Sequence, residues 1–433
     1  MRRANKFSFV EPKKSPVFYG YFILLFGTIG ILASIPGQTV GVSVFTDPVK
    51  DALELTRNQF SNAYMIGTLS SSLLIGRAGR WFDKFGARFV AFFAALLLGI
   101  SLVLCSLSVN ISKSISDAFN TQSWFIPFTI ITVLFFLIRF SGQGVITMAS
   151  RNMIMLWFDK NRGKVNSISS IAVSLGFSMS PIVFSSLIDN YGWQKSWLIL
   201  ALCLFSFSFF IIQFYRDKPE DFRLMPDGFN SNKKDTNKII IKSDFTLAEA
   251  KKTRAFWIIG FILAFNSFFI TGFTFHVVSI FESQGFIKSQ AIAVFVPISI
   301  IAIIVSTLCN ILSDYIKHRI YILIMIISGF IASLGLLFLS KTIGVYLLIV
   351  GLGILGGLFA VVNAVTWPKY FGRKHLGAIT GKIMSFLVVA SAIAPTVFSY
   401  CFSTLGTYEF ISLINIVFLL VLFIGFFKVK NPQ

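Results

Sequence analysis

The hydrophobic positions of this 433-residue chain gather into long runs separated by short polar stretches. A run of 18 or more mainly apolar residues is long enough to cross a bilayer as a helix. In lipid every backbone polar group must be satisfied within its own segment, so these runs are predicted to be helices. There are twelve of them, at residues 18–42, 60–78, 87–108, 123–150, 166–188, 195–215, 256–281, 289–313, 320–340, 343–366, 377–402 and 406–427. The pattern predicts an all-α membrane protein with twelve transmembrane helices.

Residues 216–254 form the one long polar stretch within the chain, and they separate two halves of six predicted helices, 1–215 and 255–433. The halves show weak internal repetition, because the loop at 79–88 returns in degenerate form at 310–319. Repeats of this kind are typical of transporters built from two related bundles about an axis along the membrane normal. The sequence therefore predicts two pseudo-symmetric six-helix bundles joined by a cytoplasmic linker.

The linker itself contains local structure signals. Pro226-Asp227-Gly228 is a turn signal. Thr246 followed by Glu249 has the spacing of a capping box, in which each side chain bonds the other residue's backbone N–H. We therefore expect a short helix after Asp244, just before the seventh run.

Composition and charge place the chain in a membrane. Hydrophobic residues make up 55% of it and charged residues 13%, whereas about 25% is usual for soluble domains. The net charge of +20 would suit a nucleic-acid-binding protein, but 31 of the 38 Lys and Arg residues fall in segments that share one side when both termini are cytoplasmic. This positive-inside bias predicts a multi-pass protein of the cell (inner) membrane, with the lipid bilayer and not nucleic acid as its partner.

Catalytic and cofactor signatures are missing from the sequence. The four cysteines (Cys105, Cys203, Cys309 and Cys401) all fall within apolar runs, which argues against a disulfide framework or a metal site. A membrane enzyme would need a nucleophile, a metal cluster or paired acids near the membrane. We therefore expect no enzymatic activity, no cofactor and no metal.

Arg139 lies inside the fourth run, just before the glycine-rich stretch Ser141-Gly142-Gln143-Gly144, while no Asp or Glu falls near the middle of any run. Ionisable groups within the membrane are costly and usually functional. A guanidinium here needs acceptors, which are backbone carbonyls, Gln143, water or a substrate carboxylate. Arg139 and Gln143 are therefore candidate substrate-binding residues. The alternative is a structural Arg satisfied by neighbouring helices.

Pro36-Gly37-Gln38-Thr39 interrupts the outer half of the first run. Pro frees a backbone carbonyl, and Gly lets the chain bend. Broken helices with freed backbone groups are common at transporter sites. Gln38 and Thr39 are thus candidate substrate contacts, as are Asn266 in the seventh run and Asn363 in the tenth. For each the alternative is a role in packing or in helix–helix hydrogen bonds.

The seventh run also carries Thr271, Thr274 and His276 at helical spacing. Histidine titrates near neutral pH, so His276 is either a carrier of a coupling proton or an interfacial residue hydrogen-bonded near the outer surface. Lys382 begins the eleventh run. It either binds an anion in a central cavity or extends to the cytoplasmic surface.

The loop Gly79-Arg80-Trp81-Phe82-Asp83-Lys84-Phe85-Gly86-Ala87-Arg88 resembles the G-x-x-x-D-[RK]-x-G-x-[RK] loop between helices 2 and 3 of the major facilitator superfamily of secondary transporters. Arg139 with its glycine-rich turn is similar to the helix 4 motif of that superfamily. The resemblance implies the major facilitator fold, with the acid and cations of the loop pairing to hold one transport state shut. The residues implied in gating are Gly79, Asp83, Lys84, Gly86 and Arg88, with Asp314 and Arg319 in the second half.

Several stretches look like the bacterial monocarboxylate and oxalate/formate antiporter branch of the superfamily. They are Phe18-Tyr19-Gly20-Tyr21, Leu55 to Ser61, Trp157-Phe158 with Arg162-Gly163, and Tyr370 to Gly377. Members of that branch move small carboxylates by proton symport or anion exchange. This chain departs from the branch in the eighth run, where 291–310 lacks the usual cation, and Lys382 matches the eleventh-helix lysine only loosely.

The sequence thus predicts a monomeric secondary transporter that moves a small, monocarboxylate-like organic anion by alternating access, coupled to protons or to exchange. The cavity is expected between the first, fourth, seventh and tenth helices. One alternative is a carrier of a neutral or zwitterionic solute in which Arg139 is structural. The other is a non-transporting sensor on the same scaffold.

Overall fold

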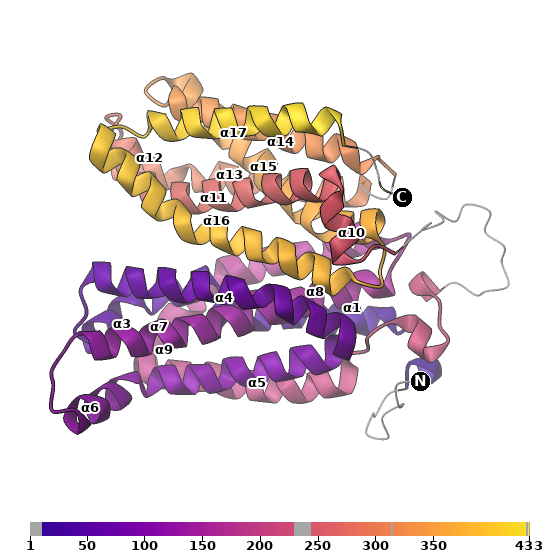
Figure 1. Ribbon diagram of the computed structural model, residues 1–433, viewed down its shortest axis with the longest axis horizontal. Coiled ribbons are helices and arrows are strands. Elements are labelled where there is room, and N and C mark those ends of the chain that lie inside the picture. Colours follow the sequence, from indigo (N-terminus) through magenta and orange to yellow (C-terminus); the bar gives the residue numbers. More distant parts are fainter. Residues whose placement is uncertain (1–10, 229–243, 313–314, 430–431, 433) are drawn as a thin grey trace. The chain divides into compact units, whose positions relative to one another are not determined.

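The structure, a computed structural model, describes residues 11–228, 244–312, 315–429 and 432, and the regular elements in these residues are all helices (Figure 1). Residue contacts group the chain into two compact units. The first comprises 1–159, 172–239 and 375–385, and the second comprises 160–171, 240–374 and 386–433. The division into sequence halves at 216–254 stays a prediction.

The first unit holds the helices coloured indigo to magenta in Figure 1. They are α1 (Gly20–Ala33), α2 (Thr39–Val44), α3 (Thr46–Ala52), α4 (Arg57–Phe85), α5 (Ala87–Ser106), α6 (Ser108–Ala118), α7 (Phe125–Ile138), α8 (Thr147–Trp157) and most of α9 (Arg162–Phe214). Short 3-10 helices are η1 (Pro12–Lys14), η2 (Ile35–Gly37), η4 (Pro219–Phe222) and η5 (Pro226–Gly228), and η3 (Arg139–Ile146) is a π-helix.

The second unit holds most of the remaining helices. They are α10 (Leu247–Lys252), α11 (Arg254–Glu282), α12 (Lys288–Ala293), α13 (Phe295–Leu312), α14 (His318–Leu337), α15 (Thr342–Phe371), α16 (Leu376–Leu405) and α17 (Glu409–Phe427). The first turns of α16 belong to the first unit, and the first turns of α9 belong to the second.

Within the described residues, all twelve predicted runs fall on helices. By length and apolar composition the described residues contain ten candidate membrane spans. One of them is the 53-residue α9, which holds two predicted runs that part at Gly192, where φ is 78° and ψ is 160°. The run 60–78 lies on α4, a 29-residue helix that also carries Arg77, Arg80, Asp83 and Lys84 toward its end. The predicted all-α membrane protein with twelve spans is confirmed.

Local signals at the helix starts also act as predicted. Thr246 N donates to Glu249 Oε2 at 2.7 Å, and Glu249 N donates to Thr246 Oγ1 at 3.3 Å, so the predicted capping box of α10 is confirmed. Thr56 and Gln59 form a second capping box at the start of α4.

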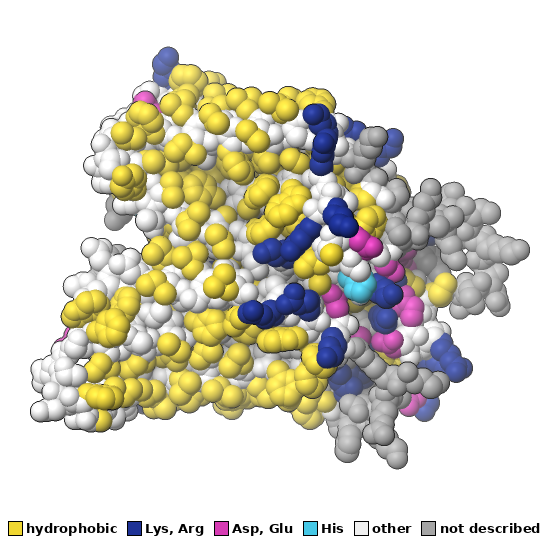
Figure 2. Space-filling model, viewed as in Figure 1, with side chains coloured by type: hydrophobic (Ala, Val, Ile, Leu, Met, Phe, Trp, Pro, Cys, Tyr) yellow, Lys and Arg dark blue, Asp and Glu magenta, His cyan; other side chains and the backbone are white. Residues whose placement is uncertain are grey.

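The helix surfaces suit contact with lipid. On the face drawn in Figure 2, hydrophobic side chains run along the length of each unit, and most of the visible Lys and Arg side chains lie toward one end of its helices. Leu73 in α4 is 76% exposed, and many other large apolar residues are also exposed. Exposed apolar surface on this scale indicates a membrane or partner contact in place of water.

Candidate functional site

The first span is broken at the predicted place. α1 ends at Ala33, a 3-10 turn runs through Ile35–Gly37, and α2 begins at Thr39. Gln38 between them is extended, with φ −89° and ψ 160°. Pro36 lacks an N–H to continue the helix, which explains the change of backbone at this point.

The fourth span is also irregular, because its middle, Arg139–Ile146, is the π-helix η3. π-Helical turns are rare and frequently occur at functional sites. Glycines let η3 approach the break in the first span: a Cβ atom on Gly37 would lie 2.5 Å from Ile138 O and 2.8 Å from Gly142 Cα. The two irregular segments of the first unit therefore meet backbone to backbone.

Arg139 is enclosed where these segments meet. The residue is 1% exposed, Nη1 donates to Gly37 O at 3.1 Å, and Cζ lies 5.2 Å from the ring centre of Tyr64 in α4. Its Nε has no hydrogen-bond partner, and no carboxylate pairs with Arg139 among the residues that the structure describes. Arginine keeps its charge in proteins. A full positive charge is thus buried against one carbonyl and one aromatic face.

Polar side chains of the same two spans bond one another next to Gly37, whose carbonyl accepts from Arg139. Gln38 Nε2 donates to Ser34 Oγ at 3.0 Å and to Thr147 Oγ1 at 3.1 Å, and Thr147 Oγ1 lies 2.9 Å from Ser34 Oγ. Thr39 Oγ1 accepts a bond from Tyr64 OH at 3.0 Å. Gln143 Oε1 is buried, with no hydrogen-bond partner in the described part of the chain.

The structure thus brings four predicted residues together in the first unit, namely Gln38, Thr39, Arg139 and Gln143. Sequence reasoning missed Ser34, Thr147 and Tyr64. Single hydroxyl groups in apolar runs usually bond their own helix. No local signal therefore separated these three from ordinary packing residues.

The seventh-run candidates belong to the second unit, where α11 packs beside α16. Thr271 Oγ1 lies 3.2 Å from Ser391 Oγ, and His276 Nε2 lies 2.9 Å from Pro395 O. Because a carbonyl only accepts, this His276 nitrogen carries a proton in that contact. The ring of His276 also stacks on Phe398.

The remaining candidates differ in how deeply they are buried. Thr274 is exposed, Asn266 in α11 is buried at 6% exposure, and Asn363 in α15 is half-buried. Lys382, which falls in the first unit, lies half-buried in the second turn of α16.

The Asp83 carboxylate accepts hydrogen bonds from backbone N–H groups at the start of α16. Its Oδ1 accepts from Gly377 N and its Oδ2 from Ala378 N, both at 2.7 Å. The first N–H groups of a helix lack intrahelical partners and favour negative charge. This explains why Asp83 bonds backbone N–H groups here, whereas the sequence led us to expect pairing with cations.

Glycines permit this contact. A Cβ on Gly79 would collide with Gly377 O, and a Cβ on Gly381 would lie 2.9 Å from Gly79 Cα. Asp83 lies beyond the apolar run of α4. Burial raises its pKa to about 6, although the two amide bonds oppose the shift.

Asp217, which the sequence did not single out, holds the turn between α4 and α5. Arg88 N donates to Asp217 Oδ1 at 3.2 Å, and the Asp217 carboxylate lies against Gly86, whose φ of 90° favours glycine. Lys84 is exposed, with Nζ 5.2 Å from the Phe85 ring centre. Its position in the sequence could have indicated this role, because Asp217 comes directly after the sixth run, where the chain returns to the loops of the first unit.

We expect Asp217→Ala to lower the free energy of unfolding by about 1 kcal/mol, because it removes a helix N-terminal acceptor. The measurement is the thermal unfolding midpoint in detergent, with hydrogen exchange of the 86–90 segment as local readout. Asp51→Ala is the matched control, since the Asp51 side chain is 71% exposed and pairs with the neighbouring Lys50. Equal midpoints for the two variants would contradict the capping role.

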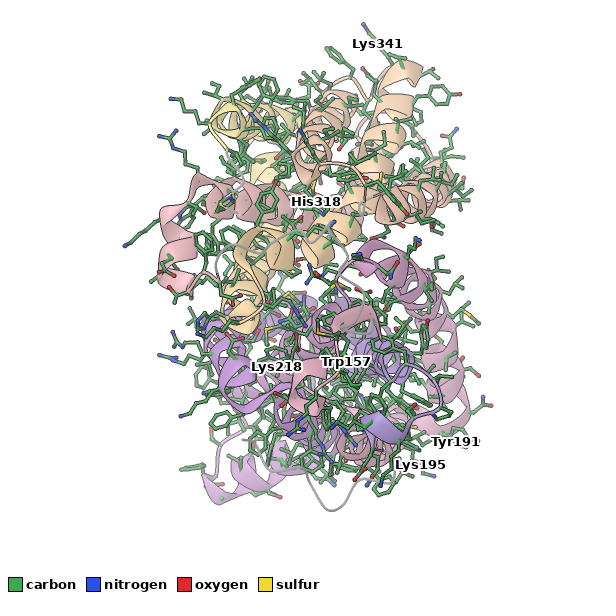
Figure 3. The ribbon with its side chains drawn as sticks, turned by 90° about the vertical axis from the view of Figure 1, so that its right-hand side faces the viewer. Trp157, Tyr191, Lys195, Lys218, His318 and Lys341 are labelled. Carbon is green, nitrogen blue, oxygen red and sulfur yellow. The ribbon has the colours of Figure 1, made fainter. Side chains whose placement is uncertain are left out.

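Two further aspartates hold the loops that follow the fourth and tenth spans. Asp227 Oδ2 accepts from Asp159 N at 2.9 Å in the first unit, and Asp244 Oδ1 accepts from Arg373 N at 2.8 Å in the second. Trp157, labelled in Figure 3, donates Nε1 to Arg216 O at 2.9 Å. Each end of the linker is therefore hydrogen-bonded to one loop, the first end to the loop after the fourth span and the second end to the loop after the tenth. These two loops hold equivalent positions in the two repeats.

The predicted counterpart of the gating loop is only partly described. Asp314 lies outside the described residues. Arg319 donates Nη2 to Phe427 O at 3.2 Å, and its guanidinium lies over the Phe426 ring.

Comparisons with known proteins agree with this architecture. The Major Facilitator Superfamily model matches residues 17–366. The probable sulfoacetate transporter SauU of Cupriavidus necator is 21% identical over 388 residues, which cover 86% of this chain and 84% of that protein.

Solved structures share the fold at low identity. The human organic anion transporter MFSD10 (TETRAN) has a TM-score of 0.62 at 12% identity, covering 95% of this chain and 100% of that one. The E. coli fucose:proton symporter FucP has a TM-score of 0.63 at 13% identity, covering 95% and 99%. With its family match over most of its length, this chain belongs to the Major Facilitator Superfamily and is a multi-pass membrane transporter.

Proposed function

We propose that this transporter carries a small organic anion by alternating access and that Arg139 attracts it. The observation that carries the proposal is the buried guanidinium, which has no carboxylate partner among the residues that the structure describes. Burying a charge is unfavourable unless it is paired and hydrogen-bonded. One carbonyl and one ring compensate this charge incompletely, so a substrate anion is the natural partner at another stage of the cycle.

Two similar proteins support an anionic substrate. The printed names of the Cupriavidus relative and of the human structure describe a sulfoacetate transporter and an organic anion transporter. The stretches similar to the monocarboxylate and oxalate/formate branch point to the same class. We further propose a monomer in the inner membrane with both termini cytoplasmic, coupled to protons or to exchange. In a proton-coupled cycle, His276 is the candidate carrier.

The contact of Asp83 with the start of α16 is the proposed gate. Two short bonds to backbone N–H groups, reached through Gly79 and Gly381, hold these elements together. Opening the path to the cytoplasm would break them. Gly86, Lys84 and Arg88 shape the adjoining turn, and Asp314 and Arg319 are proposed counterparts in the second repeat.

Arg139→Gln is expected to abolish the thermal stabilisation given by small carboxylates and sulfonates and to lower their uptake by tenfold to a hundredfold. A bond between charged groups contributes about 1.5–3 kcal/mol, and a bound ligand raises the melting temperature by mass action. Arg139→Lys should retain part of the response, because it keeps the charge without the planar fork. Uptake into vesicles, corrected for protein amount, completes the test.

Arg80→Gln is the matched control, because Arg80 is exposed on α4. Unchanged anion binding by Arg139→Gln would contradict the proposal. Stabilisation of that variant by neutral solutes would favour the carrier of a neutral or zwitterionic solute. Gln38, Asn266 and Asn363 would then be the residues to substitute.

A further inference from the structure

Tyr64 of α4 covers one side of the buried guanidinium. The Arg139 Cζ lies over the Tyr64 ring, 5.2 Å from its centre. Tyr64 is itself partly exposed, whereas Arg139 is 1% exposed. The ring therefore stands at the boundary between the enclosed charge and the surface of the first unit.

Two contacts hold the ring in this position. The hydroxyl group donates to Thr39 Oγ1 at 3.0 Å, and the ring packs edge-on against Phe135 of α7, with ring centres 5.3 Å apart. Thr39 is the first residue of α2, directly after the break in the first span. Through this hydrogen bond Tyr64 links α2, which follows the break, to α4.

We infer that Tyr64 is a positioning residue that keeps Arg139 sheltered, and that an anion reaches the guanidinium only after the Tyr64–Thr39 hydrogen bond opens. The inference rests on the proposed function of Arg139. A desolvated cation–π contact can rival a hydrogen bond in strength, so the ring competes with the anion for the same charge. The apparent affinity then depends on the fraction of protein in which the bond is open.

A guanidinium sheltered in this way favours anionic substrates over neutral ones. A neutral solute gains little from the guanidinium and cannot offset the loss of the ring contact and the hydrogen bond. An anion gains a charge-assisted bond, which is about twice as strong as a neutral one. Tyr64 therefore makes the site discriminate against uncharged molecules that would otherwise bind Gln38 and Thr147.

The test compares Tyr64→Phe and Thr39→Val, which remove the same hydrogen bond from opposite ends and leave the ring over Arg139. The probes are acetate, oxalate and sulfoacetate, with uptake kinetics in vesicles and binding by thermal shift. Whichever anion is transported should show a KM about fivefold lower in each variant, because a net hydrogen bond contributes about a factor of five. The double variant should show no further decrease, since both changes break one interaction.

Tyr21→Phe and Thr129→Val are the matched controls, because both residues are exposed and lie on other helices. A purely structural role would lower the amount of folded protein and Vmax without shifting KM. A higher KM in Tyr64→Phe beside a lower one in Thr39→Val would show that the Tyr64 hydroxyl touches the substrate, which overturns the sheltering role. Unchanged KM in both variants overturns it as well.

Arg139→Gln separates this inference from the proposed function. If that variant loses anion binding while the Tyr64 and Thr39 variants keep the parental KM, only the sheltering role fails. If it binds anions normally, the proposed function fails and the inference with it.

Discussion

Alanine at Gly37 is expected to remove most folded protein, with a loss of about 3 kcal/mol or more in the free energy of unfolding. Its Cβ would lie 2.5 Å from Ile138 O and 2.8 Å from Gly142 Cα, and both are backbone atoms that cannot rotate away. The broken first span would have to separate from the π-helix. This would also withdraw the carbonyl that binds Arg139.

The measurement is the thermal midpoint in detergent together with the monodisperse fraction on size-exclusion chromatography, where a drop of roughly 5–10 °C is expected. Gly356→Ala is the control, because its Cβ would meet nothing nearer than Ala302 Cβ at 4.0 Å. Alanine favours the helix over glycine, so the control should be neutral or slightly stabilising. A Gly37→Ala midpoint equal to the control would refute the backbone contact.

Asp83→Asn is expected to loosen the start of α16 strongly. The amide can accept only one of the two N–H bonds, so either Gly377 N or Ala378 N loses its partner. Bonds to a charged acceptor contribute about 1.5–3 kcal/mol, so amide exchange across 376–381 should accelerate about tenfold to a hundredfold. Asp117→Asn, an exposed site on α6, should leave this segment unchanged. Exchange rates equal to the parent protein would remove Asp83 from the proposed gate.

The order of elements followed from the sequence to a large extent. Apolar runs predict spans because lipid leaves the backbone no partner outside the helix. The break at Pro36-Gly37 and the capping box at Thr246 also depend on neighbouring residues alone, and both are present. The fifth and sixth runs also part where the sequence predicts, at Gly192, and this one glycine with positive φ makes the turn without any long polar loop.

For the candidate site, the sequence identified the charged residues and the structure identified their partners. Sequence identified Arg139 as a charge in an apolar run, and Asp83 by its spacing from two glycines. Their partners are Gly37 O, the Tyr64 ring and the N–H groups of Gly377 and Ala378.

The sequence by itself determined twelve spans, a cation inside an apolar run and a glycine-flanked acid, because span length, charge asymmetry and turn chemistry are local properties. That the chain is a transporter followed from its resemblance to the major facilitator superfamily. Only the tertiary structure decided what these groups bind. The Asp83 contacts join residues almost three hundred positions apart, and Arg139 meets Gly37 across more than one hundred. Such contacts depend on which helix faces pack together, and this is a property of the whole bundle that no local spacing encodes.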